Sequence, residues 1–143
     1  MRTDRTLVID TNLWISRLLL PRSFSSRTVD AALHWGVPLM SQATLSELSL
    51  VLGRSKFDRY VSRPERQQFL RLLGGIVRMV PVTQRLAVCR DPDDDKFLDL
   101  AVGGHASLIL TGDEDLLVLH PFHDVQIVSP RQFAERFVRE YKG

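Results

Sequence analysis

Two short apolar runs, LVIDTN at residues 7–12 and LILTGD at residues 108–113, each end in a carboxylate. Each run predicts a buried strand that stops at an acid, Asp10 in the first case and Asp113 in the second. In an open parallel α/β sheet, ligands bind outside the carboxyl ends of the strands. Both acids are therefore expected to face a binding crevice rather than the core. If the two strands are neighbours, Asp10 and Asp113 share one pocket, and a positively charged group must join them.

Strands and helices alternate along the rest of the chain. Further strands are expected at 37–40, 76–82 and 125–128, and helices at 13–20, 25–35, 42–52, 64–73, 94–106, 113–119 and from 130 onward. Apolar strands that alternate with helices predict a mostly parallel sheet covered by helices on both faces, an α/β fold with three layers. No repeat or linker divides the 143 residues, so we expect residues 1–143 to form a single domain.

The composition excludes several classes of protein. No window approaches the roughly 18 consecutive apolar residues that a membrane span needs. The apolar run near the N-terminus is cut off at Asp10, which does not fit a signal peptide. The lone Cys89 cannot form an internal disulfide, as is usual in a reducing cytoplasm, and is expected to be a small core residue. We therefore expect a cytoplasmic protein with no membrane segment.

The charge is unevenly distributed along the chain. Residues 1–90 hold 14 Lys and Arg against 6 Asp and Glu, a net charge of +8, whereas residues 91–143 hold 5 against 11, a net charge of −6. A basic half joined to an acidic half suggests a polyanion held by one and a cation held by the other. Ordinary scatter of charge over a solvated surface is the alternative.

Further acids border the buried faces of two helices. Glu47 lies at the edge of the apolar stripe of the 42–52 helix, where it either flanks the helix in solvent or faces a cleft. Asp95 and Asp99 lie four residues apart on one face of a later helix, where like charges repel each other. Stabilisation of acids at a helix N-terminus explains Asp93 and Asp94 well, but it does not explain Asp99.

Electrostatic repulsion would exceed the folding stability of a small domain if four ionised acids shared one pocket, namely Asp10, Glu47, Asp95 and Asp113. Two unit charges about 5 Å apart repel by roughly 3 kcal/mol at an effective dielectric near 20, and six pairs approach about 20 kcal/mol. Lys96 is expected to project from a different side of the helix than Asp95, away from this pocket. The pocket must therefore take up protons or bind hard cations. Oxygen ligands without His or Cys at a suitable spacing favour Mg²⁺ or Mn²⁺ over zinc.

A carboxylate cluster that holds one or two divalent ions suits phosphodiester hydrolysis. The metal activates water and neutralises charge on the phosphate and on the leaving oxygen. Polar neighbours are candidates to orient the carboxylates, the water or the phosphate, namely Thr11, Asn12, Ser46 and Thr111. Thr11 and Asn12 are equally suited to cap the helix that follows. The motifs GxGxxG, GxxxxGK[ST] and GxSxG do not occur, so the corresponding nucleotide-binding and hydrolase sites are not expected.

Four segments together resemble the PIN domain family, in the branch that includes toxins of bacterial and archaeal toxin–antitoxin pairs. They are VIDTN at 8–12, LSEL at 45–48, DPDDDKFLDLA at 91–101 and LTGDEDLL at 110–117, in the order of the family. The resemblance implies a Mg²⁺- or Mn²⁺-dependent endoribonuclease that cuts RNA and is silenced by a cognate antitoxin. It also implies a five-stranded sheet in the order 3-2-1-4-5, with the first and fourth strands side by side.

The resemblance implies an acidic quartet that is both catalytic and metal-binding, namely Asp10, Glu47, Asp95 and Asp113. Asp95 is taken from the run 93–95 because it opens the helical pattern that Leu98 and Ala101 continue. Asp99 and Asp115 match acids often seen in this branch and are secondary candidates.

A basic helical segment at about 54–73 follows the Glu47 helix. Its cations are candidates for salt-sensitive contacts with RNA phosphates, namely Arg54, Lys56, Arg59, Arg63 and Arg66. Phe57 and Tyr60 are expected to be core residues of a helical hairpin rather than platforms for bases. Near the C-terminus, Phe133, Phe137 and Val138 are equally suited to the inner face of the last helix and to a homodimer interface.

Two other functions compete with the ribonuclease. A phosphatase of the haloacid-dehalogenase type needs a second acid two residues after its nucleophile, where this chain has Asn12. A covalent aspartyl-phosphate would reveal such an enzyme. A non-catalytic receiver-like or RNA-binding module would combine an acidic pocket with a lysine. Lys96 is not expected to lie where such a module needs its lysine. Such a module would bind RNA tightly even after mutation of Asp10 and Glu47.

Overall fold

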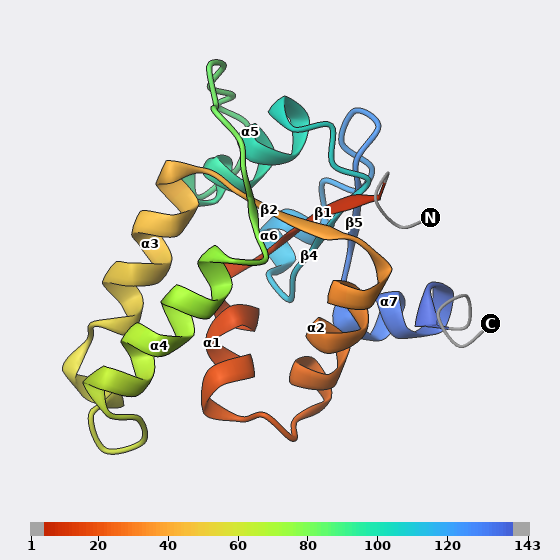
Figure 1. Cartoon of the computed structure of the whole chain (residues 1–143). Coiled ribbons are helices and arrows are strands. Elements are labelled where there is room, and N and C mark those ends of the chain that lie inside the picture. The colour runs from red at the N-terminus through yellow and green to blue at the C-terminus, as the bar shows by residue number, and fades with distance from the viewer. Residues whose placement is uncertain (1–4, 139–143) are drawn as a thin grey trace.

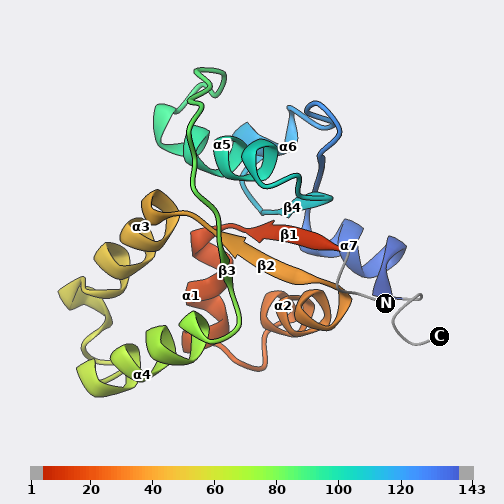
Figure 2. The ribbon, with the colours of Figure 1, turned by 45° about the horizontal axis from the view of Figure 1, so that its top comes forward.

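Five parallel strands form the centre of the molecule. The computed structural model describes residues 5–138, and its sheet has the order β3-β2-β1-β4-β5, which can be followed in Figures 1 and 2 together. The strands are β1 (Thr6–Ile9), β2 (Val37–Met40), β3 (Arg78–Met79), β4 (Leu108–Leu110) and β5 (Gln126–Val128). β1 lies between β2 and β4, and Leu7 pairs with Leu108 in a parallel register. The predicted α/β fold and strand order are confirmed.

Helices cover both faces of this sheet (Figure 2). Successive residues of a strand point to opposite faces, so Leu7 and Ile9 pack with one set of helices while Val8 packs with the other. The first set contains α1 (Thr11–Leu19), α2 (Phe24–Trp35), α3 (Gln42–Leu52), α4 (Arg63–Gly74) and α7 (Pro130–Arg136). The second contains α5 (Asp95–Gly103) and α6 (Glu114–Leu117). The result is the predicted three-layer arrangement.

Local sequence signals begin several of these helices. Ser41, Ser62 and Ser129 each close a capping box at the start of α3, α4 and α7, which satisfies backbone N–H groups of the first turn. The cap of α2 is Ser23, whose hydroxyl accepts a hydrogen bond from the backbone N–H of Ser26. Within residues 5–138, no helix is long and apolar enough to span a bilayer.

Two elements are shorter than the sequence predicts. The strand expected over 76–82 is reduced to Arg78–Met79, since this edge strand pairs only with β2 and Pro81 lacks a backbone N–H. The helix expected over 94–106 is α5, which ends at Gly103. A separate turn of 3-10 helix, η3 (Pro92–Asp94), precedes it. This turn determines which of the consecutive aspartates faces the carboxyl edge of the sheet.

Candidate metal centre

Asp10 and Asp113 come together at the carboxyl ends of β1 and β4. The two strands are neighbours, and the fully buried Thr111 joins the acids that follow them. Its hydroxyl donates a hydrogen bond of 2.6 Å to Asp10 Oδ2 and accepts one of 3.0 Å from the backbone N–H of Asp113. The pairing of the strands therefore creates the shared acidic pocket that their sequences predicted.

Glu47 reaches this pocket from the middle of α3. Its carboxylate accepts hydrogen bonds from the Thr11 hydroxyl and from Lys96 Nζ, the latter at 2.9 Å. Burial raises the pKa of the Asp10 carboxyl; the hydrogen bond from Thr111 opposes this rise, and the charges of Asp113 and Glu47 add to it. Glu47 thus faces the cleft, which was one of its two predicted positions.

Asp94 lies in the same group of acids. One carboxylate oxygen from each of Asp94, Asp113 and Asp115 lies within 4.8 Å of the others. Burial and the negative charge of Asp113 raise the pKa of Asp94 to about 7. Asp94 Oδ2 is buried and has no hydrogen-bond partner among the described residues. An orphaned carboxylate oxygen that faces another acid is a position where a bound cation would supply the missing partner.

The structure places Asp95, the predicted fourth member of the quartet, outside this group. Its Oδ1 accepts hydrogen bonds from the backbone N–H groups of Val88, at 3.1 Å, and Cys89, at 2.8 Å. The bond from Cys89 is the main reason that the pKa of Asp95 is lowered. Asp99 Oδ1 accepts a similar bond of 2.7 Å from the N–H of Leu86. Asp95 and Asp99 thus hold a loop against α5, and Asp94 takes the position expected of Asp95.

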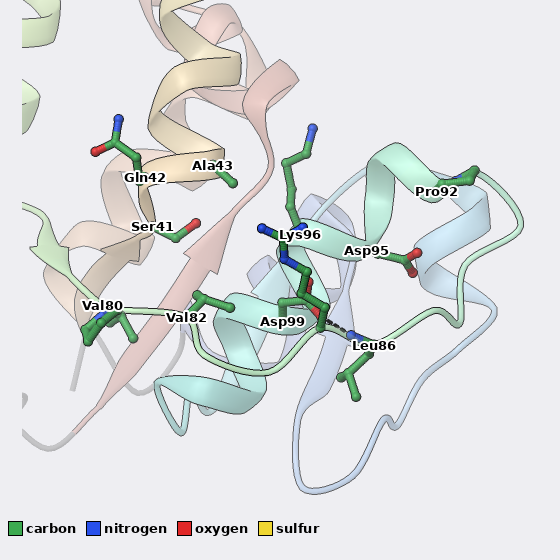
Figure 3. Close-up of a pocket in the computed structure, with 12 residues that line it drawn as sticks. Ser41, Gln42, Ala43, Val80, Val82, Leu86, Pro92, Asp95, Lys96 and Asp99 are labelled. Atoms are coloured by element: carbon green, nitrogen blue, oxygen red, sulfur yellow. Dashed lines mark hydrogen bonds between the residues drawn. The ribbon is translucent and has the colours of Figure 1, made fainter.

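The loop and α5 enclose a cavity beside the acidic pocket (Figure 3). The cavity has a volume of about 500 Å³ and is lined by Asp95, Lys96 and Asp99 together with the start of α3 and the segment 80–86. Cys89 belongs to this loop, and burial raises the pKa of its thiol to about 12. A thiol with such a pKa is not a nucleophile at neutral pH, in agreement with its predicted structural role.

The secondary candidates divide into three groups. Thr11 and Thr111 contact the acids directly, and Asp115 lies within the cluster and pairs with Arg90 at 3.1 Å. Asn12 and Ser46 have exposed side chains, and the Ser46 hydroxyl accepts a hydrogen bond from Gln42 on the surface of α3. Asp99 lines the neighbouring cavity, as described above.

The basic segment lies on the hairpin of α3 and α4, whose tip is remote from α5 in both views (Figures 1 and 2). Four of the five predicted RNA-binding cations are exposed, namely Arg54, Lys56, Arg59 and Arg63. The structure corrects the prediction for Arg66, whose side chain is buried and donates to the carbonyls of Leu52 and Val61 and to Asp58. Arg66 therefore stabilises the turn of the hairpin.

The aromatic residues of the C-terminal helix and of the hairpin also have definite positions. Phe57 packs against the core, as predicted, whereas Tyr60 is 69% exposed and the core assignment for it is wrong. Phe133 and Phe137 pack edge-on against Trp35 of α2, with ring centroids 6.0 and 5.4 Å away. Together with Val138, which packs against the same core cluster, they form the inner face of the last helix.

The sequence reasoning missed two residues of the site. Asp94 was explained as a helix-terminal acid, and the available signal was the run of three aspartates at 93–95. Lys96 was expected to point away, but its ammonium contacts Glu47. No local signal in the sequence predicts that contact, because the partner lies 49 residues earlier in the chain.

Comparison with known proteins assigns this chain to a family. A family model described as a PIN domain matches residues 6–115. The chain belongs to the PIN domain family. An uncharacterized protein of Methanocaldococcus jannaschii, MJ1680, is 28% identical over 141 residues, which cover 92% of this chain and 90% of that protein. The resemblance noted in the sequence is thereby confirmed at the level of the family.

Two solved structures share the fold. A chain of VapBC2 from Rickettsia felis, crystallised with a DNA fragment from the promoter, matches at a TM-score of 0.63 with 10% identity, covering 87% of this chain and 98% of that chain. PAE2754 from Pyrobaculum aerophilum matches at a TM-score of 0.64 with 12% identity, covering 95% and 90%. At these identities, the two structures establish the architecture alone.

The donor set fits a hard divalent cation. The converging groups are carboxylates, and the acid cluster includes the orphaned oxygen of Asp94. Carboxylate oxygens are the ligands that Mg²⁺ and Mn²⁺ prefer in proteins. Family membership supports a nuclease, and these carboxylates are the groups with which such an enzyme would hold its metal.

Proposed function

We propose that this chain is a divalent-metal-dependent endoribonuclease that hydrolyses phosphodiester bonds of RNA. The observation that carries the proposal is the buried, unpartnered Oδ2 of Asp94 beside Asp113. Asp10 links Asp94 to Glu47, because the charge of Asp10 acts on Asp94 and the charges of Asp113 and Glu47 act on Asp10, so the four acids form one electrostatic group. Without a neutralising cation, the repulsion between these carboxylates destabilises the folded state. A bound Mg²⁺ or Mn²⁺ would remove that repulsion.

In this proposal, Asp94 replaces Asp95 in the predicted quartet. A bound divalent ion would supply an activated water and would neutralise charge on the scissile phosphate. Thr111 fixes the orientation of the Asp10 carboxylate through its 2.6 Å hydrogen bond, and Thr11 does the same for Glu47. Thr111 keeps Asp10 aligned at the end of β1, and Thr11 keeps Glu47 aligned on α3, so that the acidic pocket needs little reorganisation to receive a cation.

Two features of the surface support RNA as the substrate. The cavity beside the acids, of about 500 Å³, is in the size range of small-molecule sites and is large enough for a nucleotide. The exposed cations of the α3–α4 hairpin, Arg54, Lys56, Arg59 and Arg63, would add salt-dependent attraction to the phosphate backbone. Single-stranded RNA suits such a site because its unpaired bases are accessible.

We further propose that the enzyme is the toxin of a toxin–antitoxin pair and acts in the cytoplasm. The similarity in fold to a chain of the VapBC2 complex supports this role. A cognate antitoxin would then be its protein partner, and a small DNA-binding protein encoded by the adjacent upstream gene would support the assignment. The absence of such a gene would count against the toxin role but not against the nuclease.

The direct test is cleavage of RNA by the purified chain with added Mn²⁺. Asp10→Asn should lower the rate by about 100-fold or more, since it removes a carboxylate of the metal site. Asp124→Asn, a change to an exposed acid remote from the cluster, is the matched control and should leave the rate unchanged. The metal should also raise the free energy of unfolding, by about 2.7 kcal/mol at 100 times its dissociation constant. Absence of both cleavage and stabilisation by Mn²⁺ would overturn the proposal.

A further inference from the structure

Lys96 forms an ion pair inside the acidic pocket. Its Nζ lies 2.9 Å from Glu47 Oε1, and the two side chains are 22% and 25% exposed, so that neither is a freely solvated surface group. Lys96 is the second residue of α5, directly after Asp95, and Glu47 is in the middle of α3. The pair therefore places a positive charge from one wall of the pocket against an acid of the other.

The acids of the pocket fall into two halves with different partners. In the Glu47 half, both carboxylate oxygens are engaged, Oε1 by Lys96 and Oε2 by the Thr11 hydroxyl. In the Asp94 half, the carboxylates of Asp94 and Asp113 converge, and Asp94 Oδ2 has no partner among the described residues. Lys96 thus supplies a cation to the first half, whereas the cation of the second half, Arg90, pairs with Asp115 at 3.1 Å, and Asp94 Oδ2 is left without a partner among the described residues.

We infer that Lys96 is a resident cation of the metal centre that occupies the place beside Glu47 which a second divalent ion would take. The chain then binds one divalent ion, in the half formed by Asp94 and Asp113. This inference rests on the proposed metal site and deepens it. A second ion would have to displace the ammonium from Glu47, and the displaced charge would remain close by and repel the incoming ion.

A purely structural role is the alternative to this inference. The ion pair joins α5 to α3, and removing it would then change the melting temperature without changing how many ions bind. The number of bound ions therefore separates the two roles, because a structural tether has no effect on it.

The experiment counts the Mn²⁺ ions bound by the full chain, by calorimetric titration and by electron paramagnetic resonance of the free ion. Wild type should bind one ion. Lys96→Met, a neutral side chain of similar length, should bind a second ion at least 10-fold more tightly than wild type does. Lys96→Arg keeps the charge and is the matched control, expected to bind one ion. Two ions in wild type, or a single ion in a folded Lys96→Met variant, would overturn the inference.

A second variant tests the same point from the other side. Glu47→Gln removes the partner of Lys96 but leaves the Asp94 half intact, so the first ion should bind with a dissociation constant within threefold of wild type. Loss of that ion in a folded Glu47→Gln variant would overturn the inference, because the ion would then depend on Glu47. Failure of wild type to bind any Mn²⁺ would overturn the proposed function as well, whereas a wrong ion count with intact RNA cleavage overturns only the role of Lys96.

Discussion

Asp94 and Asp95 are neighbours in the sequence, but their carboxylates have opposite environments. Asp94 is turned towards Asp113 with one buried oxygen unpartnered, and its pKa is raised to about 7. Asp95 accepts two backbone hydrogen bonds from the loop over α5, and its pKa is lowered. Asp95 has hydrogen-bond donors within the protein, whereas one oxygen of Asp94 has no partner among the described residues.

The difference shows how to separate structural acids from functional acids in a run of aspartates. A carboxylate that accepts several N–H bonds stabilises the fold as an anion. A buried carboxylate without a donor destabilises the metal-free fold and is retained where it binds something. The comparison of Asp94 with Asp95 therefore predicts different results for the same substitution one residue apart.

The largest expected effect is on catalysis. Asp94→Asn should lower the rate of metal-dependent RNA cleavage by about 100-fold or more, because it removes a charged group of the proposed metal site. Asp95→Asn keeps the shape and one acceptor oxygen, and it should change the rate by no more than about threefold. Rates measured for the two variants at saturating Mn²⁺ test this directly. Equal losses in both variants would contradict the separation between the two acids.

The second effect is on stability as a function of pH without metal. Because the folded pKa of Asp94 is raised from 3.8 to about 7, the folded state holds more protons than the unfolded state between these values. The free energy of unfolding should therefore fall as the pH rises through this window, by about 1–2 kcal/mol after allowance for solvent screening. Asp95, with its lowered pKa, has the opposite sign, and its contribution is lost as the pH falls below its ordinary value.

Urea unfolding at pH 5 and at pH 8 in the presence of a chelator measures this dependence. In Asp94→Asn the fall in stability between the two pH values should be smaller than in wild type. The variant should also be more stable than wild type at pH 8 without metal, since it lacks the buried charge. A variant with the same pH dependence as wild type would show that Asp94 does not titrate in this range.

The smallest effect concerns the loop. Asp95→Ala removes the acceptor of the Val88 and Cys89 N–H groups and should cost about 1 kcal/mol of stability, a value reduced by the exposure of the site. Hydrogen exchange of these two amides should become faster, while exchange of the β1 and β4 amides stays slow. Asp93→Ala, a change to an exposed neighbour, is the control. Unchanged protection of both amides would contradict the tether.

The strands and the first two acids could be predicted from the sequence because their signals are local. An apolar run that stops at an acid identifies β1 with Asp10 and β4 with Asp113, and no long-range information is needed. Their adjacency came from the resemblance to the PIN family, since periodicity does not give strand order. The capping box at Ser129 is equally local.

The differences between the predicted and the observed positions of the side chains at the site have a geometric cause. The fourth acid was assigned from the helical pattern that starts at Asp95, but η3 precedes the helix and turns by about 120° per residue instead of 100°. That turn brings Asp94 towards Asp113. Lys96 and Arg66 were misjudged for a different reason. Each is a long side chain whose direction depends on acceptors that the fold brings close, Glu47 for the first and the carbonyls of Leu52 and Val61 for the second.

The loop over α5 is held through its backbone. Asp95 and Asp99 accept bonds from the N–H groups of residues 86, 88 and 89, and none of these bonds depends on a loop side chain. Any residue except proline preserves such a bond. Substitutions in the loop can therefore reshape the wall of the cavity while its anchorage to α5 stays the same. The sequence of this loop is therefore free to change. The acids beside it are not, because their carboxylates are needed.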